Sequence, residues 1–389
     1  MTRTKYLLLT LIQLQVFTAF AQNLPSLFTG RNINATFSIL AYDYKTKEWG
    51  IAVATNNIYV GNSTVYIQPG LGAFSVIAET NPKYASAGFK KLKAGKTIQQ
   101  AIEEVKQQDK NAHYRQVSGI DAQGNVFAFT GKALKYWKGA SAHLIGKKHV
   151  VMGNQLDKKV LSQMSATFIN SQGTLAQRLV ASLAAGQKAG GQISGKQSAA
   201  VVVKGLNNRW YNQIDLRVDH SKTPIQDLQT LLNYHYGRIT LNQARYAHRK
   251  GRKKLATQKL KKAELMLDGW TGMYARIAQA HIVMNNEEKA VQWIQKGLKE
   301  NPQWAVNLSS FYCLRKHPKI KPLIKPEKFT LKDWEHALSM YSNLGRELDL
   351  IKLAQKLLKE GKTSSYLNYL LGRAYYFEQN KKQAMVYLN

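Results

Sequence analysis

TFSILAYDYKTKEWGIAVATN (residues 36–56) is the stretch that decides the fold. Its two halves, 36–43 and 49–56, are apolar and rich in strand-forming residues, and the polar segment YKTK (44–47) separates them. Two such runs around a short polar segment are typical of a β-hairpin. We therefore expect an antiparallel pair of strands that begins at Thr36.

Strand and helix patterns continue from this hairpin to about residue 238. Further strands are expected at 72–80, within 115–131 as a pair around a turn, and at 149–154, 198–205 and 213–220. Helices are expected at 84–95, 97–108 with Thr97 as N-cap, 156–170, 174–190 and 223–237. Grouped strands and paired helices favour an α+β domain with helices layered on sheets over a regular βαβ alternation.

The N-terminus has the pattern of a secretory signal peptide. Arg3 and Lys5 precede an apolar run of about 15 residues, and Ala19-Phe20-Ala21 supplies small residues at the cleavage positions. A membrane span needs roughly 20 apolar residues, so a cleaved signal is favoured over an anchor. The sequence predicts a signal at 1–21, a linker or propeptide at 22–35, an exported chain and no transmembrane segment after signal removal.

The chain carries a net charge of +33, with 56 Lys and Arg against 23 Asp and Glu. Nucleic acid is not expected as a partner of an exported protein. Residues Arg245–Lys262 hold nine Lys or Arg and no acid. This run fits either a site for an anionic envelope polymer or a solvated helix face.

Residues 239–389 have helical patterns throughout, and part of this stretch repeats with a period of 34 residues. Ala244, Ala256, Leu260 and Ala263 recur one period later as Ala278, Ala290, Ile294 and Gly297, and Leu371, Gly372, Tyr375, Ala384 and Leu388 carry a similar pattern. This spacing is typical of tetratricopeptide (TPR) repeats, which predicts an all-α domain with a protein partner. The segment between the second and last units, which includes 317–326, is expected to be irregular.

No motif predicts a cofactor or a metal. GGQISGKQS (190–198) has the glycine and lysine spacing of a phosphate-binding loop, but Gln197 replaces the hydroxyl residue, and a helix precedes the loop where a strand is required. The nine histidines form no zinc-ligand pattern, and a single cysteine excludes a disulfide framework within the chain.

Thr36 is the candidate nucleophile. A threonine hydroxyl needs a base, and a free α-amine on the same residue, with a pKa of about 8, can take its proton. Cleavage of the Ala35–Thr36 bond would create that amine. From the residues alone, an ordinary strand threonine is the favoured explanation of Thr36.

A resemblance favours the nucleophile. The motifs that carry it are the hairpin 36–56, GLGAFSVIAETNPKYASAGFKKLKAG (70–95), RQVSGIDAQGNVFAFTG (115–131), MGNQL (152–156), SGKQSAAVVV (194–203) and DLRVDH (215–220). In this order and spacing, residues 36–238 resemble the family called domain of unknown function 1028, grouped with the N-terminal nucleophile (Ntn) hydrolases. The resemblance implies a four-layer αββα sandwich and a nucleophilic Thr36.

The resemblance also implies polar site residues that serve as oxyanion donors, bind substrate or orient the amine. They are Asn81, Asn154, Gln197, Ser198, Asp215, Arg217 and Asp219. Because signal cleavage would leave 14 residues in front of Thr36, activity requires a further cut. Two hypotheses remain: an exported Ntn-type amidohydrolase of unknown substrate, or a non-catalytic Ntn-like binding domain on a TPR scaffold.

Overall fold

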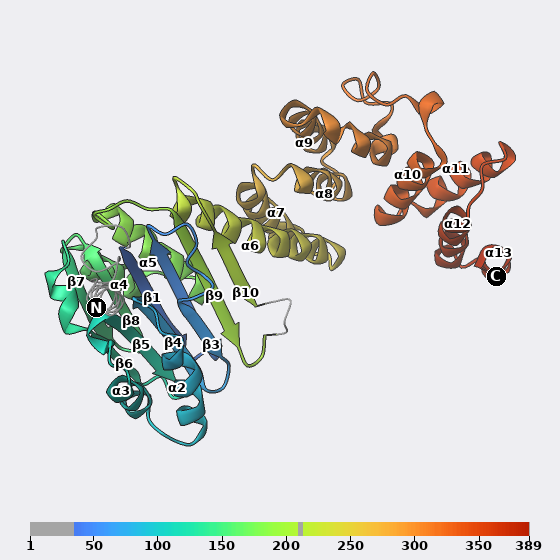
Figure 1. Cartoon of the computed structure of the whole chain (residues 1–389). Helices are drawn as coiled ribbons and strands as arrows, with labels where there is room; N and C mark the ends of the chain where they lie inside the picture. Colours follow the sequence, from blue (N-terminus) through green and yellow to red (C-terminus); the bar gives the residue numbers. More distant parts are fainter. Residues whose placement is uncertain (1–34, 209–212, 389) are drawn as a thin grey trace, which may run out of the picture. The chain divides into compact units, whose positions relative to one another are not determined.

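The computed structural model describes residues 35–208 and 213–388, so the expected signal peptide and all but the last residue of the expected linker lie outside the described residues. The chain divides into two compact units, the first ending at Leu232 and the second beginning at Asn233. The first unit is α+β with antiparallel sheets, and the second is all-helical (Figure 1).

The first unit contains two antiparallel sheets. Sheet A has the order β10-β9-β2-β1-β8-β7, and sheet B has the order β3-β4-β5-β6. The strands are β1 (Thr36–Asp43), β2 (Glu48–Thr55), β3 (Val65–Gln68), β4 (Gly72–Ala78), β5 (Arg115–Asp121), β6 (Val126–Thr130), β7 (Ala140–Gly146), β8 (His149–Leu156), β9 (Ser198–Gly205) and β10 (Ile214–Val218). The predicted hairpin is confirmed as β1 and β2, whereas the sequence did not predict β3 and β7.

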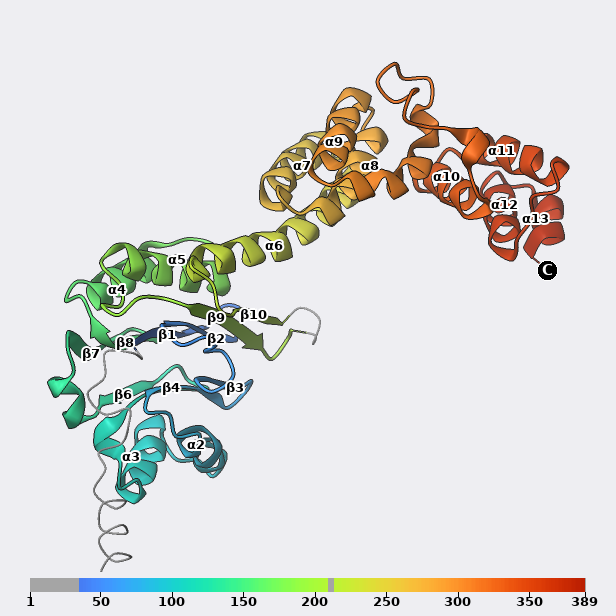
Figure 2. The same cartoon turned by 45° about the horizontal axis from the view of Figure 1, so that its top comes forward.

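Helices cover the outer face of each sheet, and the two sheets face each other (Figure 2). The helices are α2 (Lys83–Lys93) and α3 (Ile98–Gln108) on sheet B, and α4 (Val160–Asn170) and α5 (Leu175–Lys188) on sheet A. Leu40 and Trp49 of sheet A pack with Ala73 and Ile120 of sheet B in the core between the sheets. Both faces of β1 are therefore covered, which explains why its apolar run is nearly continuous.

Two local predictions concern helix ends. Thr97 is confirmed as the N-cap of α3, where its side chain accepts from the backbone of Gln100 and the Gln100 side chain accepts in return. The prediction that a helix closes at Gly237 is wrong, because α6 runs from Pro224 to Arg249. Gly237 lies inside α6, where a Cβ atom would be 2.7 Å from Cγ of Leu267. This glycine permits close helix packing instead of ending a helix.

The second unit consists mainly of helix pairs. After α6 come α7 (Lys253–Leu267), α8 (Thr271–Val283), α9 (Glu287–Glu300), α10 (Leu331–Asn343), α11 (Glu347–Lys359), α12 (Ser365–Phe377) and α13 (Lys381–Leu388). Three of the turns, between α8 and α9, α10 and α11, and α12 and α13, resemble one another. Their middle residues, Asn285, Gly345 and Gln379, all have a positive φ, which is a common way to end a helix.

Most of the expected small and apolar positions are buried in these helices, among them Ala244, Ala278 and Ala384, but Leu388 of the last unit is 48% exposed. The prediction of an irregular segment before the last unit is wrong in part. Pro302–Leu314 and Pro326–Lys328 are 3-10 turns, but α10 and α11 form a further helix pair. Leu331 and Ser365 begin equivalent helices 34 residues apart, so the extra residues lie before α10 and hide the phase of the repeat.

Candidate functional site

A row of four polar side chains crosses sheet A at the start of β1. Thr36 pairs with Asn154 of β8 on one side and with Thr55 of β2 on the other, and Thr55 pairs with Ser198 of β9. All four residues are buried, Thr36 with 5% of its surface exposed. We call Asn154, Thr36, Thr55 and Ser198 the polar row.

The polar row faces the space between the sheets. Ser38 lies two residues after Thr36, and its Oγ accepts a 3.1 Å hydrogen bond from Ser75 Oγ of sheet B. Because side chains alternate along a strand, Thr36 shares this face. The sequence-predicted Thr36, Asn154 and Ser198 therefore lie in one row in the interior, with Thr55 between Thr36 and Ser198.

The carbonyl oxygen of Ala35, the residue before Thr36, accepts three hydrogen bonds. The donors are Asn56 N at 3.1 Å, Thr55 Oγ1 at 2.9 Å and Gln192 Nε2 at 2.5 Å. We call these three groups the Ala35 cradle. A carbonyl oxygen has two lone pairs, so three donors exceed its ordinary demand. The cradle suits an oxygen that acquires negative charge, as in an oxyanion hole.

The hydroxyls of Thr36 and Thr55 are 2.9 Å apart. A threonine hydroxyl has one proton to donate, and Thr55 donates its proton to Ala35 O. Thr55 Oγ1 therefore accepts from Thr36 Oγ1. The result is a short path of hydrogen bonds from the hydroxyl of Thr36, through Thr55, to the carbonyl oxygen of the preceding residue.

Asn154 holds the other side of Thr36. Its Oδ1 accepts from Thr36 N at 3.2 Å, and its Nδ2 donates to Oε1 of Gln116 at 2.9 Å. Gln116 is fully buried, and its Nε2 donates to Thr130 Oγ1 at 3.1 Å and to Gly153 O at 2.9 Å. Because both ends of the Asn154 amide are bonded, its oxygen is fixed toward Thr36 N.

Gln197 lies beside the polar row, directly before its member Ser198, which begins β9. The backbone N–H of Gln197 donates to Thr55 O at 2.9 Å, and Ser198 Oγ donates to Asn57 O at 2.8 Å. The Oε1 atom of Gln197 is buried and has no hydrogen-bond partner among the described residues. A buried acceptor without a donor is costly, so Gln197 is equipped to accept a hydrogen bond from a ligand.

Asp215, Arg217 and Asp219 form a separate group on and just after β10, the edge strand of sheet A. Arg217 Nε and Nη2 donate to the two carboxylate oxygens of Asp215 at 2.8 and 3.1 Å. These hydrogen bonds to Asp215, with the negative charges of Asp215 and Asp219, raise the pKa of Arg217 above its usual value. The Asp215 and Arg217 side chains are 44% and 40% exposed, so the pair lies at the surface and the polar row is buried.

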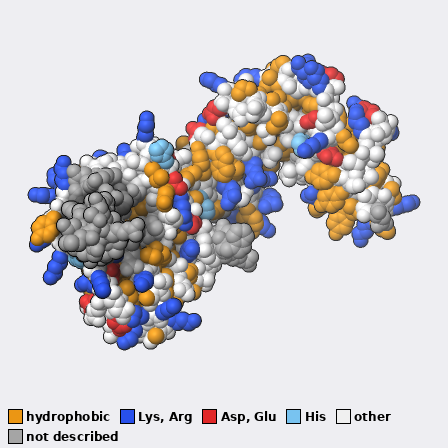
Figure 3. Space-filling model, viewed as in Figure 1, with side chains coloured by type: hydrophobic (Ala, Val, Ile, Leu, Met, Phe, Trp, Pro, Cys, Tyr) orange, Lys and Arg blue, Asp and Glu red, His pale blue; other side chains and the backbone are white. Residues whose placement is uncertain are grey.

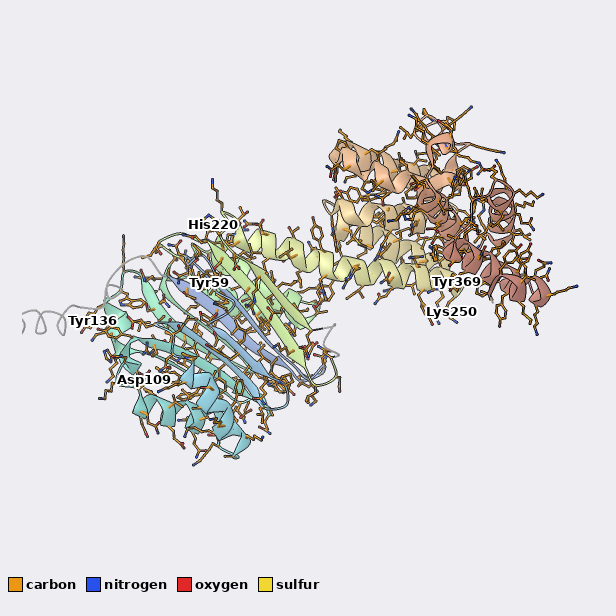
Figure 4. The ribbon with its side chains drawn as sticks, turned by 45° about the vertical axis from the view of Figure 1, so that its right-hand side comes forward. Tyr59, Asp109, Tyr136, His220, Lys250 and Tyr369 are labelled. Carbon is orange, nitrogen blue, oxygen red and sulfur yellow. The ribbon has the colours of Figure 1, made fainter. Side chains whose placement is uncertain are left out.

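Asn81 belongs to another cluster. Its Nδ2 donates to Asp109 Oδ2 at 3.2 Å, and Arg115 Nε donates to the same oxygen at 3.0 Å. Burial favours a higher pKa for Asp109, but the hydrogen bonds from Arg115 and Asn81 outweigh it and lower that pKa. Asp109 directly follows α3 (Figure 4). The amide of Asn81 therefore ties the turn before α2 to the end of α3.

Four of these groups were missed from the sequence: Thr55, Asn56, Gln116 and Gln192. A signal did exist for Thr55, because a hairpin with a four-residue turn at 44–47 places Thr55 opposite Thr36. No comparable signal exists for Gln192, whose contact with Ala35 joins residues 157 positions apart.

Within the described residues there is no helix that is long and apolar enough to cross a membrane, and no group of three potential metal ligands.

The first unit is thus an α+β domain of two facing antiparallel sheets with a buried polar row. A family model described as a family of unknown function (DUF1028) matches residues 36–228. The chain belongs to this family through its first unit, as the resemblance predicted.

One similar solved structure is the crystal structure of protein SPO2555 from Silicibacter pomeroyi, which carries the same family label. It is 30% identical in sequence, the match covers 51% of this chain and 84% of that chain, and the TM-score is 0.47. A search of curated proteins found no match.

Proposed function

We propose that the chain is an exported Ntn-type hydrolase that cuts its own Ala35–Thr36 bond and then hydrolyses amide bonds with Thr36 as nucleophile. The Ala35 cradle carries the proposal, because its three donors converge on the carbonyl oxygen of that bond. The facing sheets between helix layers agree with the four-layer αββα sandwich of Ntn hydrolases. The 34-residue phase of α10 and α12 agrees with TPR repeats that dock a protein partner.

The first step is an attack of Thr36 Oγ1 on the carbonyl carbon of Ala35. The hydroxyl proton passes to Thr55 Oγ1, whose own proton passes to the carbonyl oxygen, so the tetrahedral intermediate is formed without a charged base. The C–N bond then breaks as the proton on the former carbonyl oxygen is transferred to the nitrogen, which leaves as the amine. The Ala35 carbonyl re-forms, now in an ester with Thr36 Oγ1. Water hydrolyses the ester to an Ala35 carboxylate and a free Thr36.

The second step uses the new amine. With a pKa of about 8, the amine can accept the proton of its own hydroxyl as Thr36 Oγ1 attacks a substrate carbonyl. Asn154 Oδ1, which accepts from Thr36 N before the cut, would orient the amine after it. The Ala35 cradle would then serve the oxyanion of the substrate, with Gln197 and Ser198 at its border.

The test is the mature N-terminus of the secreted protein, read by intact mass and N-terminal sequencing. We expect it at Thr36. Replacement of Thr36 by Val, which keeps the volume and removes the hydroxyl, should leave the bond intact and abolish hydrolysis of amide substrates, whereas Thr36→Ser should retain both. A stable N-terminus at Gln22 in the wild type would contradict the proposal.

The alternative function is a non-catalytic binding domain on the helical scaffold. One observation favours it: Ala35 and Thr36 are buried to 0% and 5% exposure in the uncut chain, so the intact bond is compatible with a well-packed domain. The same N-terminal measurement separates the two functions, because only the hydrolase requires the cut.

A further inference from the structure

The second unit contains a cavity of about 590 Å³ that the proposed hydrolase does not use. Its wall is formed by the C-terminal half of α6, the end of α8, the turn between α10 and α11, and α12. Three arginines, Arg245, Arg249 and Arg373, line it. Lys250, which follows α6, marks this end of the helix in Figure 4. The volume is in the range of sites for small ligands or short segments.

The three arginines of this cavity, Arg245, Arg249 and Arg373, form no ion pair within 4.0 Å with the carboxylates of the described residues. Burial, together with the neighbouring charges of Arg249 and Arg276, lowers the pKa of Arg245. Like charges held together in a partly buried site cost free energy, and an anion in the cavity would relieve that cost.

Arg373 is also held in position. Its guanidinium lies 5.4 Å from the ring centre of Phe377, and both side chains line the cavity. Stacking on an aromatic ring fixes the plane of a guanidinium while leaving its N–H groups free to donate. Planar guanidinium groups bind carboxylate and phosphate oxygens in pairs. The cavity therefore suits an oxyanion, and Phe377, with 55% of its surface exposed, offers an apolar contact next to it.

Glu347, the first residue of α11, narrows the choice of anion. Its Oε2 atom is buried and has no hydrogen-bond partner among the described residues. Burial raises the pKa of Glu347, while Arg373 opposes that rise and Glu378 adds to it. The carboxylate needs a donor, and it repels a ligand that is negatively charged throughout. A peptide with acidic side chains supplies both carboxylates and backbone N–H donors.

We propose that this cavity binds a short acidic peptide segment of a partner protein, with its carboxylates on Arg245, Arg249 and Arg373 and a peptide N–H on Glu347. This site is independent of Thr36. It is also more specific than attraction by the basic run Arg245–Lys262, since most charges of that run lie outside the cavity.

The experiment measures binding of a fluorescent Asp- and Glu-containing hexapeptide to the full chain by anisotropy at near-physiological salt. The pocket variant Arg245→Gln/Arg373→Gln is compared with Lys253→Gln/Lys254→Gln, which removes the same charge from exposed positions of α7. We expect the pocket variant to weaken binding by about tenfold or more and the control by about twofold at most. Equal weakening by both variants would overturn the proposal.

Thermal unfolding provides a second readout. Without peptide, the pocket variant should melt no lower than the wild type, because it loses repulsion among arginines. Peptide should raise the melting temperature of the wild type and of the control, but not of the pocket variant. If peptide stabilises the pocket variant as much as the wild type, the proposal is wrong.

Glu347 distinguishes a peptide from a phosphate ligand. Glu347→Ala should weaken binding of the peptide, because the N–H loses its acceptor, and should strengthen binding of inorganic phosphate, because a repulsive charge is gone. Tighter peptide binding by Glu347→Ala, or displacement of the peptide by phosphate at a lower concentration than that of the peptide, would contradict the assignment to a peptide.

Discussion

At the scale of single residues, Thr55 is the most informative side chain in the first unit. Its Oγ1 is hydrogen-bonded both to the proposed nucleophile, Thr36 Oγ1, and to the carbonyl oxygen of the bond to be cut, Ala35 O, each at 2.9 Å. Its backbone O accepts from Gln197 N, which fixes it to β9. A side chain with two such contacts acts on proton transfer and on oxyanion stabilisation together.

Thr55→Val should therefore slow self-cleavage while keeping the packing volume. Loss of one oxyanion donor typically costs on the order of 10²–10³ in rate. The measurement is the fraction of cut chain over time, read by intact mass after synthesis. Thr55→Ser should keep most of the rate. The matched control is Thr64→Val, which removes a buried hydroxyl bonded to Val60 O; a similar delay in that variant would show that the effect is one of folding.

His149 makes the stability of the first unit depend on pH. It is buried between β8 and α4, with Nδ1 3.3 Å from Lys147 O and Nε2 2.9 Å from Ser165 Oγ. A carbonyl can only accept, so Nδ1 carries the proton and Nε2 accepts from Ser165. Burial lowers the pKa of His149. The unfolded chain thus binds the proton more readily than the folded one.

The free energy of unfolding should consequently fall as the pH drops below about 6.5, the ordinary pKa of histidine. The fall should end once the pH is below the lowered pKa of His149 in the folded chain. Well above pH 6.5, His149 should contribute nothing to the pH dependence. Urea unfolding at about pH 7 and about pH 5 measures this loss. His149→Gln should show a smaller loss than the wild type, and the exposed His113→Gln is the control. An unchanged loss in His149→Gln would contradict this role.

Among the helices and strands, the sequence predicts best those features that depend on residues close together in the chain. The hairpin of β1 and β2 and the cap at Thr97 depend on neighbours within a few residues, so the sequence predicts them. β3 has only four residues, and β7 exposes Leu144 and Ile145, so neither has a clear burial pattern. The packing role of Gly237 was not predicted, because it depends on the approach of Leu267, which lies in another helix.

In the packing of α6 on α7, replacement of Gly237 by Ala has two opposed effects on the free energy of unfolding. Gly237→Ala gains about 1 kcal/mol of helix propensity. A Cβ atom there would lie 2.7 Å from Leu267 Cγ and 3.0 Å from Met266 Cβ, and overpacking costs about 1–3 kcal/mol. Neither neighbouring atom is the flexible end of a side chain, so we expect the clash to prevail and the unfolding midpoint to fall.

A double-mutant cycle tests this reason. In a Leu267→Ala background, Gly237→Ala should be less destabilising than in the wild type, because one of the two clashing atoms has been removed. Additive effects would show that Gly237 is not required for the approach of α7.

At the scale of the whole molecule, the two units divide inside a continuous helix. The unit division falls between Leu232 and Asn233, and α6 extends on both sides of it. The side chains of Ile225, Leu228 and Leu232 are buried to 3%, 0% and 0% exposure. The first turns of α6 therefore belong to the first unit, although the expected boundary lies at residue 238.

A truncated chain that ends at Gly237 should fold, whereas one that ends at Lys222 should not reach the same stability. Each buried aliphatic side chain that is lost removes roughly 1.5–3 kcal/mol. Thermal unfolding followed by circular dichroism measures the difference. Equal melting temperatures of the two truncated chains would show that α6 contributes nothing to the first unit.

Charge and site differ in how far the sequence predicts them. The net charge of +33 is a count, and Lys and Arg side chains appear over much of the visible surface (Figure 3). The candidate site instead depends on which predicted residues the fold brings together. Thr36, Asn154 and Ser198 lie in one row, but Asn81 is hydrogen-bonded to Asp109 and Arg217 to Asp215, away from that row. Residue types identify which side chains can do chemistry, and only the pairing of distant strands selects those that meet.

The polar row also restricts how the gene can change in length. Thr36, Thr55, Asn154 and Ser198 meet because four strands keep one register, and in a strand a shift of one residue turns every side chain to the opposite face. Substitutions can alter one member of the row at a time. An insertion or deletion of a single codon within β1 or β2 would turn Thr36 or Thr55 toward the helices together with the other inward-facing side chains of that strand, so we expect length variation in this domain to be confined to its turns.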